Sequence, residues 1–207
     1  MDPFDEARAY LARLPHGTAS YPECMVRASV FDPWRTDLPP LDLRVASEVL
    51  SPAFAAYLRS GPSDDWIPEV WASVLLELWF VHVCERDERQ CRARLRQGNL
   101  ELFEGPLYRT VMRVLSPSLV LMGMARTWGL TRRGTSAKAT MGSRSASPRT
   151  ADITLAHPSW IFSERQLTGF EEGFMATGDM LKVADHRVLR PSTSENETTF
   201  RLEWTDR

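Results

Sequence analysis

The segment SERQLTGFEEGFMATG, residues 163–178, carries the signals of a helix between two strands. Ser163 and Gln166 have the spacing of a capping box at a helix start, and the final glycine is a natural helix end. On either side, residues 150–156 (TADITLA) and 200–204 (FRLEW) alternate apolar and polar side chains. That period is typical of half-buried antiparallel strands. The segment therefore predicts a helix that covers one face of a small antiparallel sheet.

The residues before this segment have the spacing of helices. Apolar side chains recur at helical intervals over residues 4–14, 45–58, 65–97, 107–115 and 116–129. The longest of these, Asp65 to about Gln97, is predicted as one helix that is buried up to Cys84 and protrudes into water beyond it. A break is expected at Ser51-Pro52 within the second helix. The four prolines of residues 21–40 predict a packed loop with at most a short strand or helical turn.

These patterns predict an α+β fold, in which a helical N-terminal half packs on a small antiparallel sheet. The chain has 207 residues, of which 43% are hydrophobic and 25% charged. Such a composition is typical of one globular domain. We therefore expect a single domain over residues 1–207, mainly helical over 1–130, with strand, helix and hairpin over 131–207.

Cysteine usage and the chain start indicate the compartment. Three cysteines cannot all pair within the chain, and the first residues are acidic where a secretory signal would be basic and then apolar. The longest apolar run, Val70–Cys84, is interrupted by Glu77 and His82, and it is too short for a bilayer core of roughly 30 Å. The sequence predicts a cytoplasmic protein without a membrane span.

The C-terminal frame carries a resemblance to a known superfamily. The matching residues are WIFS at 160–163, GFEEGF at 169–174, Gly178, Val183 and the closing TTFRLEW. This frame resembles the end of the TRAPP-type and four-vinyl-reductase-type ligand-binding superfamily, whose relatives include the haem nitric-oxide sensors. More broadly, residues 107–204 are similar to a family of uncharacterised paralogues in myxobacteria.

The resemblance implies a fold that encloses a small apolar ligand or lipid tail in some relatives and only mediates protein contacts in others. Zinc-binding sensors of the superfamily carry cysteines near the chain end, whereas no cysteine follows Cys91 here. The haem sensors use a helix histidine and a downstream Tyr-x-Ser-x-Arg motif, which this chain lacks. Gly169 and Gly173 lie on one helix face, which predicts a close approach of that helix to the sheet.

Six large apolar side chains are candidates for a ligand pocket where the helix after Ser116 meets the sheet. They are Met122, Met124, Trp128, Trp160, Phe170 and Phe174. Ordinary core packing is the alternative, because a domain of this size needs large apolar side chains in any case.

Residues 105–151 contain no acidic group, and five of their basic residues surround one predicted polar strand. These are Arg132, Arg133, Lys138, Arg144 and Arg149. Together they predict a basic patch for phosphate, nucleic acid, anionic lipid or an acidic partner. Nucleic acid is the weakest of these, since no aromatic residues interleave with the charges and the pI is about 6.1. A solvated loop is the alternative.

Signatures of catalysis are missing from the sequence, including phosphate-binding glycine loops, His-Glu-x-x-His and Gly-x-Ser-x-Gly. Cys84, Glu88 and Cys91 share a helix face, but they lack the paired spacing of structural zinc sites, so no metal and no cofactor are expected. The sequence predicts a non-enzymatic regulatory or scaffolding module that acts through a protein partner or as a homodimer. The alternative is a small-molecule or lipid-binding sensor domain with an apolar pocket.

Overall fold

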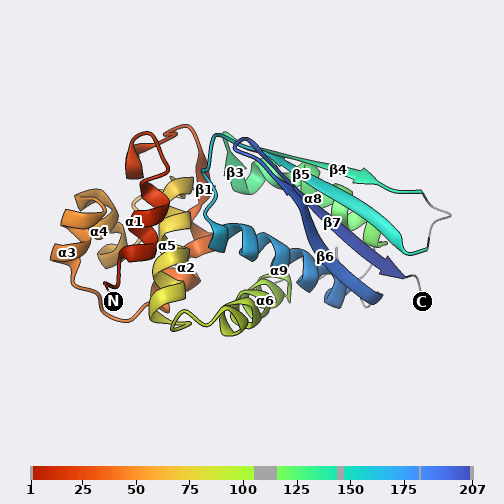
Figure 1. The fold of residues 1–207 in the computed structure, drawn as a ribbon, viewed down its shortest axis with the longest axis horizontal. Coiled ribbons are helices and arrows are strands. Elements are labelled where there is room, and N and C mark those ends of the chain that lie inside the picture. The colour runs from red at the N-terminus through yellow and green to blue at the C-terminus, as the bar shows by residue number, and fades with distance from the viewer. Residues whose placement is uncertain (1, 105–115, 144–146, 182, 206–207) are drawn as a thin grey trace. The chain divides into compact units, whose positions relative to one another are not determined.

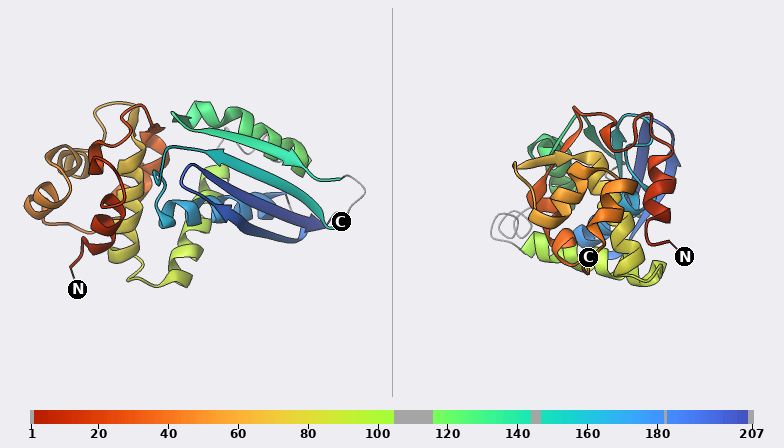
Figure 2. Two further views of the ribbon diagram at one scale, coloured as in Figure 1. Left: turned by 45° about the horizontal axis from the view of Figure 1, so that its top comes forward. Right: turned by 90° about the vertical axis from the view of Figure 1, so that its left-hand side faces the viewer.

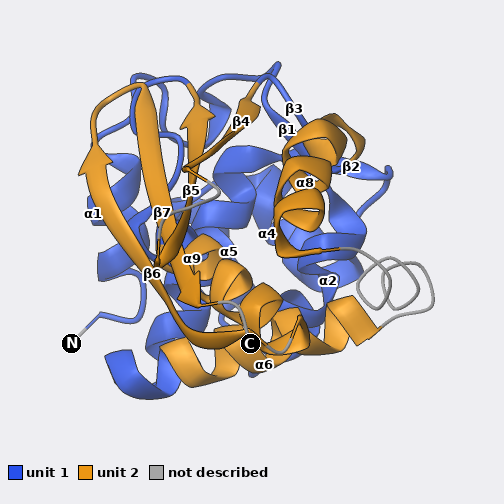
Figure 3. Cartoon of the chain, turned by 90° about the vertical axis from the view of Figure 1, so that its right-hand side faces the viewer, with its two compact units in different colours: residues 1–91, 131–134, 158–167 blue, residues 92–130, 135–157, 168–207 orange. Residues whose placement is uncertain are grey.

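The computed structural model describes residues 2–104, 116–143, 147–181 and 183–205. The chain is α+β, as predicted, with α-helices and two antiparallel sheets. Its residues form two units, which Figure 3 shows in different colours. Unit 1 comprises residues 1–91, 131–134 and 158–167, and unit 2 comprises residues 92–130, 135–157 and 168–207. Each unit thus takes residues from both sides of residue 130, where the sequence predicts a change from helices to strands. The helix predicted over 107–115 lies outside the described residues.

Unit 1 is built around one buried helix. Its elements are α1 (Asp5–Leu11), η1 (Gly17–Ala19), β1 (Met25–Arg27), α2 (Ala28–Thr36), α3 (Leu43–Val49), α4 (Pro52–Ser60), β2 (Trp66–Pro68), α5 (Glu69–His82) and β3 (Arg132–Arg133). Helices α1 and α2 pack against α5, which is buried along most of its length (Figure 1). The three short strands form a sheet in the order β2-β1-β3. The predicted break at Ser51 is confirmed, because its hydroxyl caps α4 by accepting from the Phe54 amide.

The prediction of a packed loop over residues 21–40 is wrong. The segment forms β1 and the nine-residue helix α2, with Pro33 inside the helix. Trp34 of α2 packs edge-on against Trp79 of α5, with ring centroids 4.9 Å apart. The indole of Trp79 also donates a hydrogen bond of 2.8 Å to Asp37, just after α2. This packing on α5 outweighs the local cost of a proline within the helix.

The single helix predicted from Asp65 to about Gln97 is also wrong, since α5 ends at His82 and α6 (Glu88–Glu104) begins after a turn. Within the turn, Glu85 and Arg86 have φ angles of 52° and 62°, which no α-helix can contain. The Asp87 carboxylate then caps α6 by accepting from the Gln90 amide at 3.0 Å. An aspartate followed three residues later by glutamine is a helix-start signal, so the sequence carries the break.

Unit 2 places helices against a four-stranded sheet. It contains α6 from residue 92 on, most of α8 (Pro117–Thr131), β4 (Ser136–Met141), β5 (Arg149–Ala156), most of α9 (Glu164–Met180), β6 (Ala184–Thr193) and β7 (Glu197–Thr205). All strand pairs are antiparallel, in the order β4-β5-β7-β6 (Figure 2). The strands predicted over 150–156 and 200–204 are confirmed, and they pair with Ile153 opposite Phe200. The predicted cap of α9 is confirmed too, since the Ser163 hydroxyl accepts from the Gln166 amide at 3.2 Å.

The glycines of α9 face partners that differ from those predicted. A Cβ atom at Gly173 would lie 3.1 Å from Oδ1 of Asn99 on α6, and one at Gly169 would lie 3.9 Å from Leu95. Their expected close approach to the sheet is therefore wrong, because this face of α9 meets a helix. Gly178 is the residue where α9 meets the sheet, since a Cβ there would lie 2.8 Å from Nε2 of His186 on β6.

Within the described residues, none of the helices combines the length and the apolar character needed to cross a membrane.

Candidate functional site

Four aromatic rings form a connected cluster in unit 2. Phe170 and Phe174 follow each other by one turn of α9, and both contact Phe200 of β7, with centroid distances of 6.2 Å and 5.4 Å. Trp128 of α8 lies 5.6 Å from Phe170, and its indole donates to the Thr135 hydroxyl at 2.9 Å. Phe200 and Phe174 are buried, whereas Trp128 and Phe170 are only half-buried. The cluster is thus closed at the sheet and partly open at α8.

The two methionines of the predicted pocket lie on α8, and both are half-buried. Met124 accepts a weak hydrogen bond from the Thr177 hydroxyl at 3.8 Å and packs on a small core in which α6, α8 and α9 meet. Trp160 belongs to unit 1, where the guanidinium of Arg13 lies 4.1 Å from its ring centroid. The structure therefore places five of the six predicted pocket residues in unit 2, and it pairs the sixth with Arg13.

A partly open cavity of about 20 Å³ lies beside Phe174 and is bordered by residues of α8, α9, β6 and β7. Its walls are mainly apolar and include Leu121, Leu202 and Trp204, while His186 is among the few polar residues. A volume of this size holds about one water molecule, but a bound water needs two or more polar partners. The lining therefore suits a very small apolar group better than it suits water.

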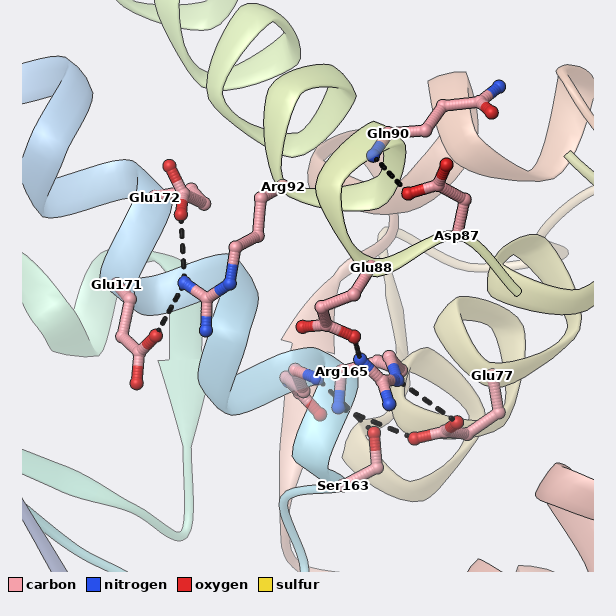
Figure 4. A network of polar contacts seen from close by, with 10 residues as sticks. Glu77, Asp87, Glu88, Gln90, Arg92, Ser163, Arg165, Glu171 and Glu172 are labelled. Atoms are coloured by element: carbon pink, nitrogen blue, oxygen red, sulfur yellow. Dashed lines mark hydrogen bonds and ion pairs between the residues drawn. The ribbon is translucent and has the colours of Figure 1, made fainter. Parts of the chain in front are cut away.

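Charged residues fasten α6 to α9 in the same unit. One Arg92 nitrogen contacts carboxylate oxygens of both Glu171 and Glu172, at 2.8 Å and 2.9 Å (Figure 4). The second oxygen of Glu171 lies 2.8 Å from Nε of Arg190 on β6. Both carboxylates are nearly buried, so these contacts offset the cost of removing them from water. No sequence pattern indicated these ion pairs.

A second charged group lies one turn further along α6 and about two turns further along α9. Arg96 contacts both carboxylate oxygens of Asp179 at 2.7 Å, and this hydrogen bonding raises the pKa of the Arg96 guanidinium. Nε2 of His186 lies 3.2 Å from the same carboxylate. His186 therefore sits between Asp179 and the apolar cavity, a position that no sequence motif indicates.

Unit 1 contains a buried polar seam that sequence analysis missed. Glu69, Ser73 and Glu77 are spaced four residues apart on α5, and all three are buried. The Gln166 amide bridges Glu69 and Ser73, and Nε of Arg132 lies 3.3 Å from Glu69. The sequence did carry a signal for this seam, namely polar residues at intervals of four on an otherwise apolar helix. Side chains with that spacing lie on one face of the helix and contact the same neighbouring element.

Glu77 and Glu88 share Arg165 in unit 1 (Figure 4). The Arg165 amide donates to Glu77 at 3.4 Å, while its guanidinium contacts Glu88 and lies 3.8 Å from the Phe80 ring centroid. Burial raises the pKa of Glu77 to about 7, although hydrogen bonding and Arg165 act in the opposite direction. This carboxyl group therefore titrates near neutral pH.

The five residues of the predicted basic patch have different environments. Arg132 is buried against Glu69, and Arg133 is exposed with its guanidinium 3.9 Å from the Trp66 ring centroid, both in unit 1. In unit 2, Lys138 is exposed on β4 and Arg149 is half-buried at the start of β5. The prediction for Arg144 lies outside the described residues.

Among the described residues, no group of three or more histidine, cysteine or acidic side chains is arranged to hold a metal ion. Cys84 and Cys91 are both buried.

Comparisons with solved structures find H-NOX domains. One structure, from a study of haem distortion in the H-NOX family, has a TM-score of 0.54 and 10% identity, covering 87% of this chain and 95% of the other. A mutant H-NOX domain of T. tengcongensis has a TM-score of 0.51 and 10% identity, covering 87% and 98%. A Cs H-NOX mutant that contains 4-cyano-L-phenylalanine has a TM-score of 0.51 and 11% identity, covering 87% and 97%. No family model and no curated protein sequence matches the chain.

These findings correct two predictions. The chain has a fold similar to that of H-NOX domains, so the closer assignment to the TRAPP and four-vinyl-reductase family and to its myxobacterial paralogues is wrong. That assignment rested on glycines and on the spacing of apolar residues. Many α+β folds that pack a helix on a sheet have glycines and apolar residues at similar positions. The predicted role as a scaffolding module is contradicted as well, because the structures that share the fold are haem-binding domains.

The cavity described in unit 2 does not fit a haem. Ligand pockets for molecules of that size occupy roughly 300 Å³ or more, whereas the cavity in unit 2 has about 20 Å³.

A haem also needs an axial ligand, and a histidine binds the haem iron through a ring nitrogen. Nε2 of His157 contacts Thr198, and that of His186 contacts Asp179. Nε2 of His82 is buried with no hydrogen-bond partner among the described residues, but His82 belongs to unit 1 and not to the unit that contains the cavity. Burial, together with the nearby Arg86, lowers the pKa of His82.

Proposed function

We propose that this chain is a sensor domain for a small apolar molecule, which binds among the aromatic side chains and the cavity of unit 2. The observation that carries the proposal is Phe174, which belongs to the four-ring cluster and also lines the cavity. The similarity of the fold to H-NOX domains, one of which comes from a study of haem distortion, supports a ligand-binding role.

The half-buried side chains explain how such a ligand could exceed the size of the cavity. Met122, Met124, Trp128 and Phe170 keep part of their apolar surface exposed to water. A ligand that covered them would gain roughly 25 cal/mol for each Å² removed from water. Methionine side chains also adapt their shape readily to a bound molecule. The ligand is therefore expected to be apolar and to contact α8 and α9.

The remaining sequence predictions concern catalysis, the cellular compartment and the partner of the proposed sensor. We propose that it has no catalytic step of its own, that it acts in the cytoplasm, and that a protein partner or a second copy receives its signal. The predicted basic patch is kept only as a proposal for Lys138 and Arg149 of unit 2, because Arg132 is buried in an ion pair and belongs, like Arg133, to unit 1.

Native mass spectrometry of the purified protein, followed by the same sample denatured, tests the proposal. We expect an additional mass that disappears on denaturation and is lost in Phe174→Trp, which fills the space beside the cavity. Leu189→Trp is the matched control, because Leu189 is exposed on β6 and does not line the cavity. Equal retention of the molecule by both variants, or no retained molecule in the parent protein, would contradict the proposed site.

Absorbance spectroscopy distinguishes the haem alternative. The protein is produced with haem supplied during expression, and the Soret band is compared with protein concentration. We expect no stoichiometric haem, because the cavity of unit 2 is too small for the porphyrin. A one-to-one Soret signal that is lost in His82→Ala would replace the proposed apolar ligand with haem.

A further inference from the structure

One buried carboxylate of α5 contacts both segments that unit 1 takes from the second half of the chain. These segments are residues 131–134 and 158–167, and residues of unit 2 flank each of them on both sides. Oε1 of Glu69 accepts a hydrogen bond from the Gln166 side-chain amide, and Nε of Arg132 lies 3.3 Å from the same oxygen. Arg132 belongs to the first segment and Gln166 to the second, so Glu69 joins the two.

Each segment adjoins a helix that carries part of the four-ring cluster of unit 2. Arg132 directly follows α8 and stands four residues after Trp128. Gln166 lies in the first turn of α9, four residues before Phe170. Trp128 and Phe170 are the two half-buried rings of the cluster, with centroids 5.6 Å apart. The end of α8 and the start of α9 are therefore fastened to one oxygen atom, each about one helical turn away from a ring.

The Glu69 carboxylate depends on these two contacts. Glu69 is 0% exposed, and its second oxygen, Oε2, is buried with no hydrogen-bond partner among the described residues. A buried charge is stable only when its partners offset the cost of removing it from water. The contacts of Oε1 with Arg132 and Gln166 therefore have to offset most of that cost.

We propose that Glu69 couples the end of α8 to the start of α9, so that a change at one of these helix ends alters the hydrogen bonding of the other. Weakening of the Arg132 contact leaves Glu69 as a buried charge with an incomplete set of partners. Such a carboxylate regains partners by local opening toward water, and that opening also releases the Gln166 amide. The two contacts thus form and break together.

The coupling itself needs no ligand, but its use as a signal route rests on the proposed function. A molecule bound among the rings of α8 and α9 would displace these helices about one turn from Arg132 and Gln166. Glu69 would then pass the displacement to α5, the buried helix of unit 1.

Hydrogen–deuterium exchange of the full chain, measured by mass spectrometry, tests the coupling without a ligand. Arg132→Lys keeps the positive charge but loses Nε, the atom that contacts Glu69. We expect the amides of residues 167–172, near the start of α9, to exchange about 10- to 100-fold faster, because a hydrogen bond to a charged group changes an equilibrium by about that factor. Arg133→Lys is the matched control, since Arg133 is exposed on the same strand and lies over the Trp66 ring.

Glu69→Gln separates coupling from simple fastening. In this background Arg132→Lys should no longer accelerate exchange at residues 167–172, because the link is already broken. The amides of α4 report on global stability, and in Arg132→Lys they should exchange at the parental rate. If Glu69→Gln does not fold, the comparison of Arg132→Lys with Arg133→Lys still decides the question.

Three outcomes would overturn the proposal. They are unchanged exchange at residues 167–172 in Arg132→Lys, an equal acceleration there in Arg133→Lys, and an equal acceleration over α4. None of them bears on the ligand proposed for unit 2, because the exchange experiment contains no ligand. Failure of the coupling and failure of the proposed function are therefore distinguishable.

Discussion

Replacement of Gly178 by alanine tests the contact between α9 and β6 that shapes the cavity. Alanine normally stabilises a helix interior by up to about 1 kcal/mol relative to glycine. Here the added Cβ would lie 2.7 Å and 2.8 Å from Cγ and Nε2 of His186, closer than real Cβ contacts occur. Overpacking of this kind costs about 1–3 kcal/mol. We therefore expect Gly178→Ala to lower the free energy of unfolding by about 1–2 kcal/mol.

A double-mutant cycle in urea, followed by tryptophan fluorescence, separates the two effects. In the His186→Ala background the clash is gone, so Gly178→Ala should become neutral or stabilising, with a coupling energy of about 1–3 kcal/mol. Gly123 is the control, because its added Cβ on α8 would meet no atom within 4 Å, and Gly123→Ala should stabilise the protein. If Gly178→Ala stabilises the parent protein as much as Gly123→Ala does, the described packing of His186 is wrong.

Three further variants test other parts of the structure. Burial raises the pKa of Glu77 to about 7, so the folded state binds this proton more tightly than the unfolded state, and stability should fall as pH rises from about 4.5 through 7. Glu77→Gln should reduce the dependence of the urea midpoint on pH across this range. An unchanged slope of midpoint against pH would contradict the assignment. Asp87→Ala removes the cap of α6 and should cost about 1 kcal/mol in urea unfolding, whereas Asp87→Ser should restore most of it. Phe200→Ala should lower the free energy of unfolding by about 3–5 kcal/mol, because the Phe200 ring is fully buried. If it destabilises the protein no more than Leu189→Ala, which removes an exposed side chain, Phe200 is not central to the cluster.

The sheet and α9 could be predicted from the sequence because each signal there is local and agrees with the packing. Alternation over 150–156 reports which side chains face α9, and the cap at Ser163 marks where α9 begins. Helix α2 could not be predicted in this way. Pro33 argues against it locally, and its stability comes from contacts with Trp79, a residue more than 40 positions away. Tertiary packing of this kind leaves no periodic trace in the segment itself.

The candidate site was predictable in part for the same reason. Phe170 and Phe174 share one face of α9, so helical spacing alone brings them together, and Phe200 follows from the strand register. Trp160 lies just before α9 in sequence, but its φ angle of 58° changes the direction of the chain there. The role of His186 depends on the missing side chain of Gly178, a complementarity between two elements that neither sequence segment reveals.

The fold and a ligand site depend on different residues, so a fold similar to that of H-NOX domains can occur here with a cavity in unit 2 that is too small for haem. Alternating strands and the helix packed on them need only apolar side chains at the right period, and a wide range of sequences satisfies this. A haem needs in addition a large pocket and an axial ligand. In unit 2 the space beside Phe174 is nearly filled by Leu121, Leu202 and Trp204. What these side chains leave is a site whose size and apolar lining would select a ligand far smaller than a porphyrin, or one that extends outward over the half-buried rings of α8 and α9.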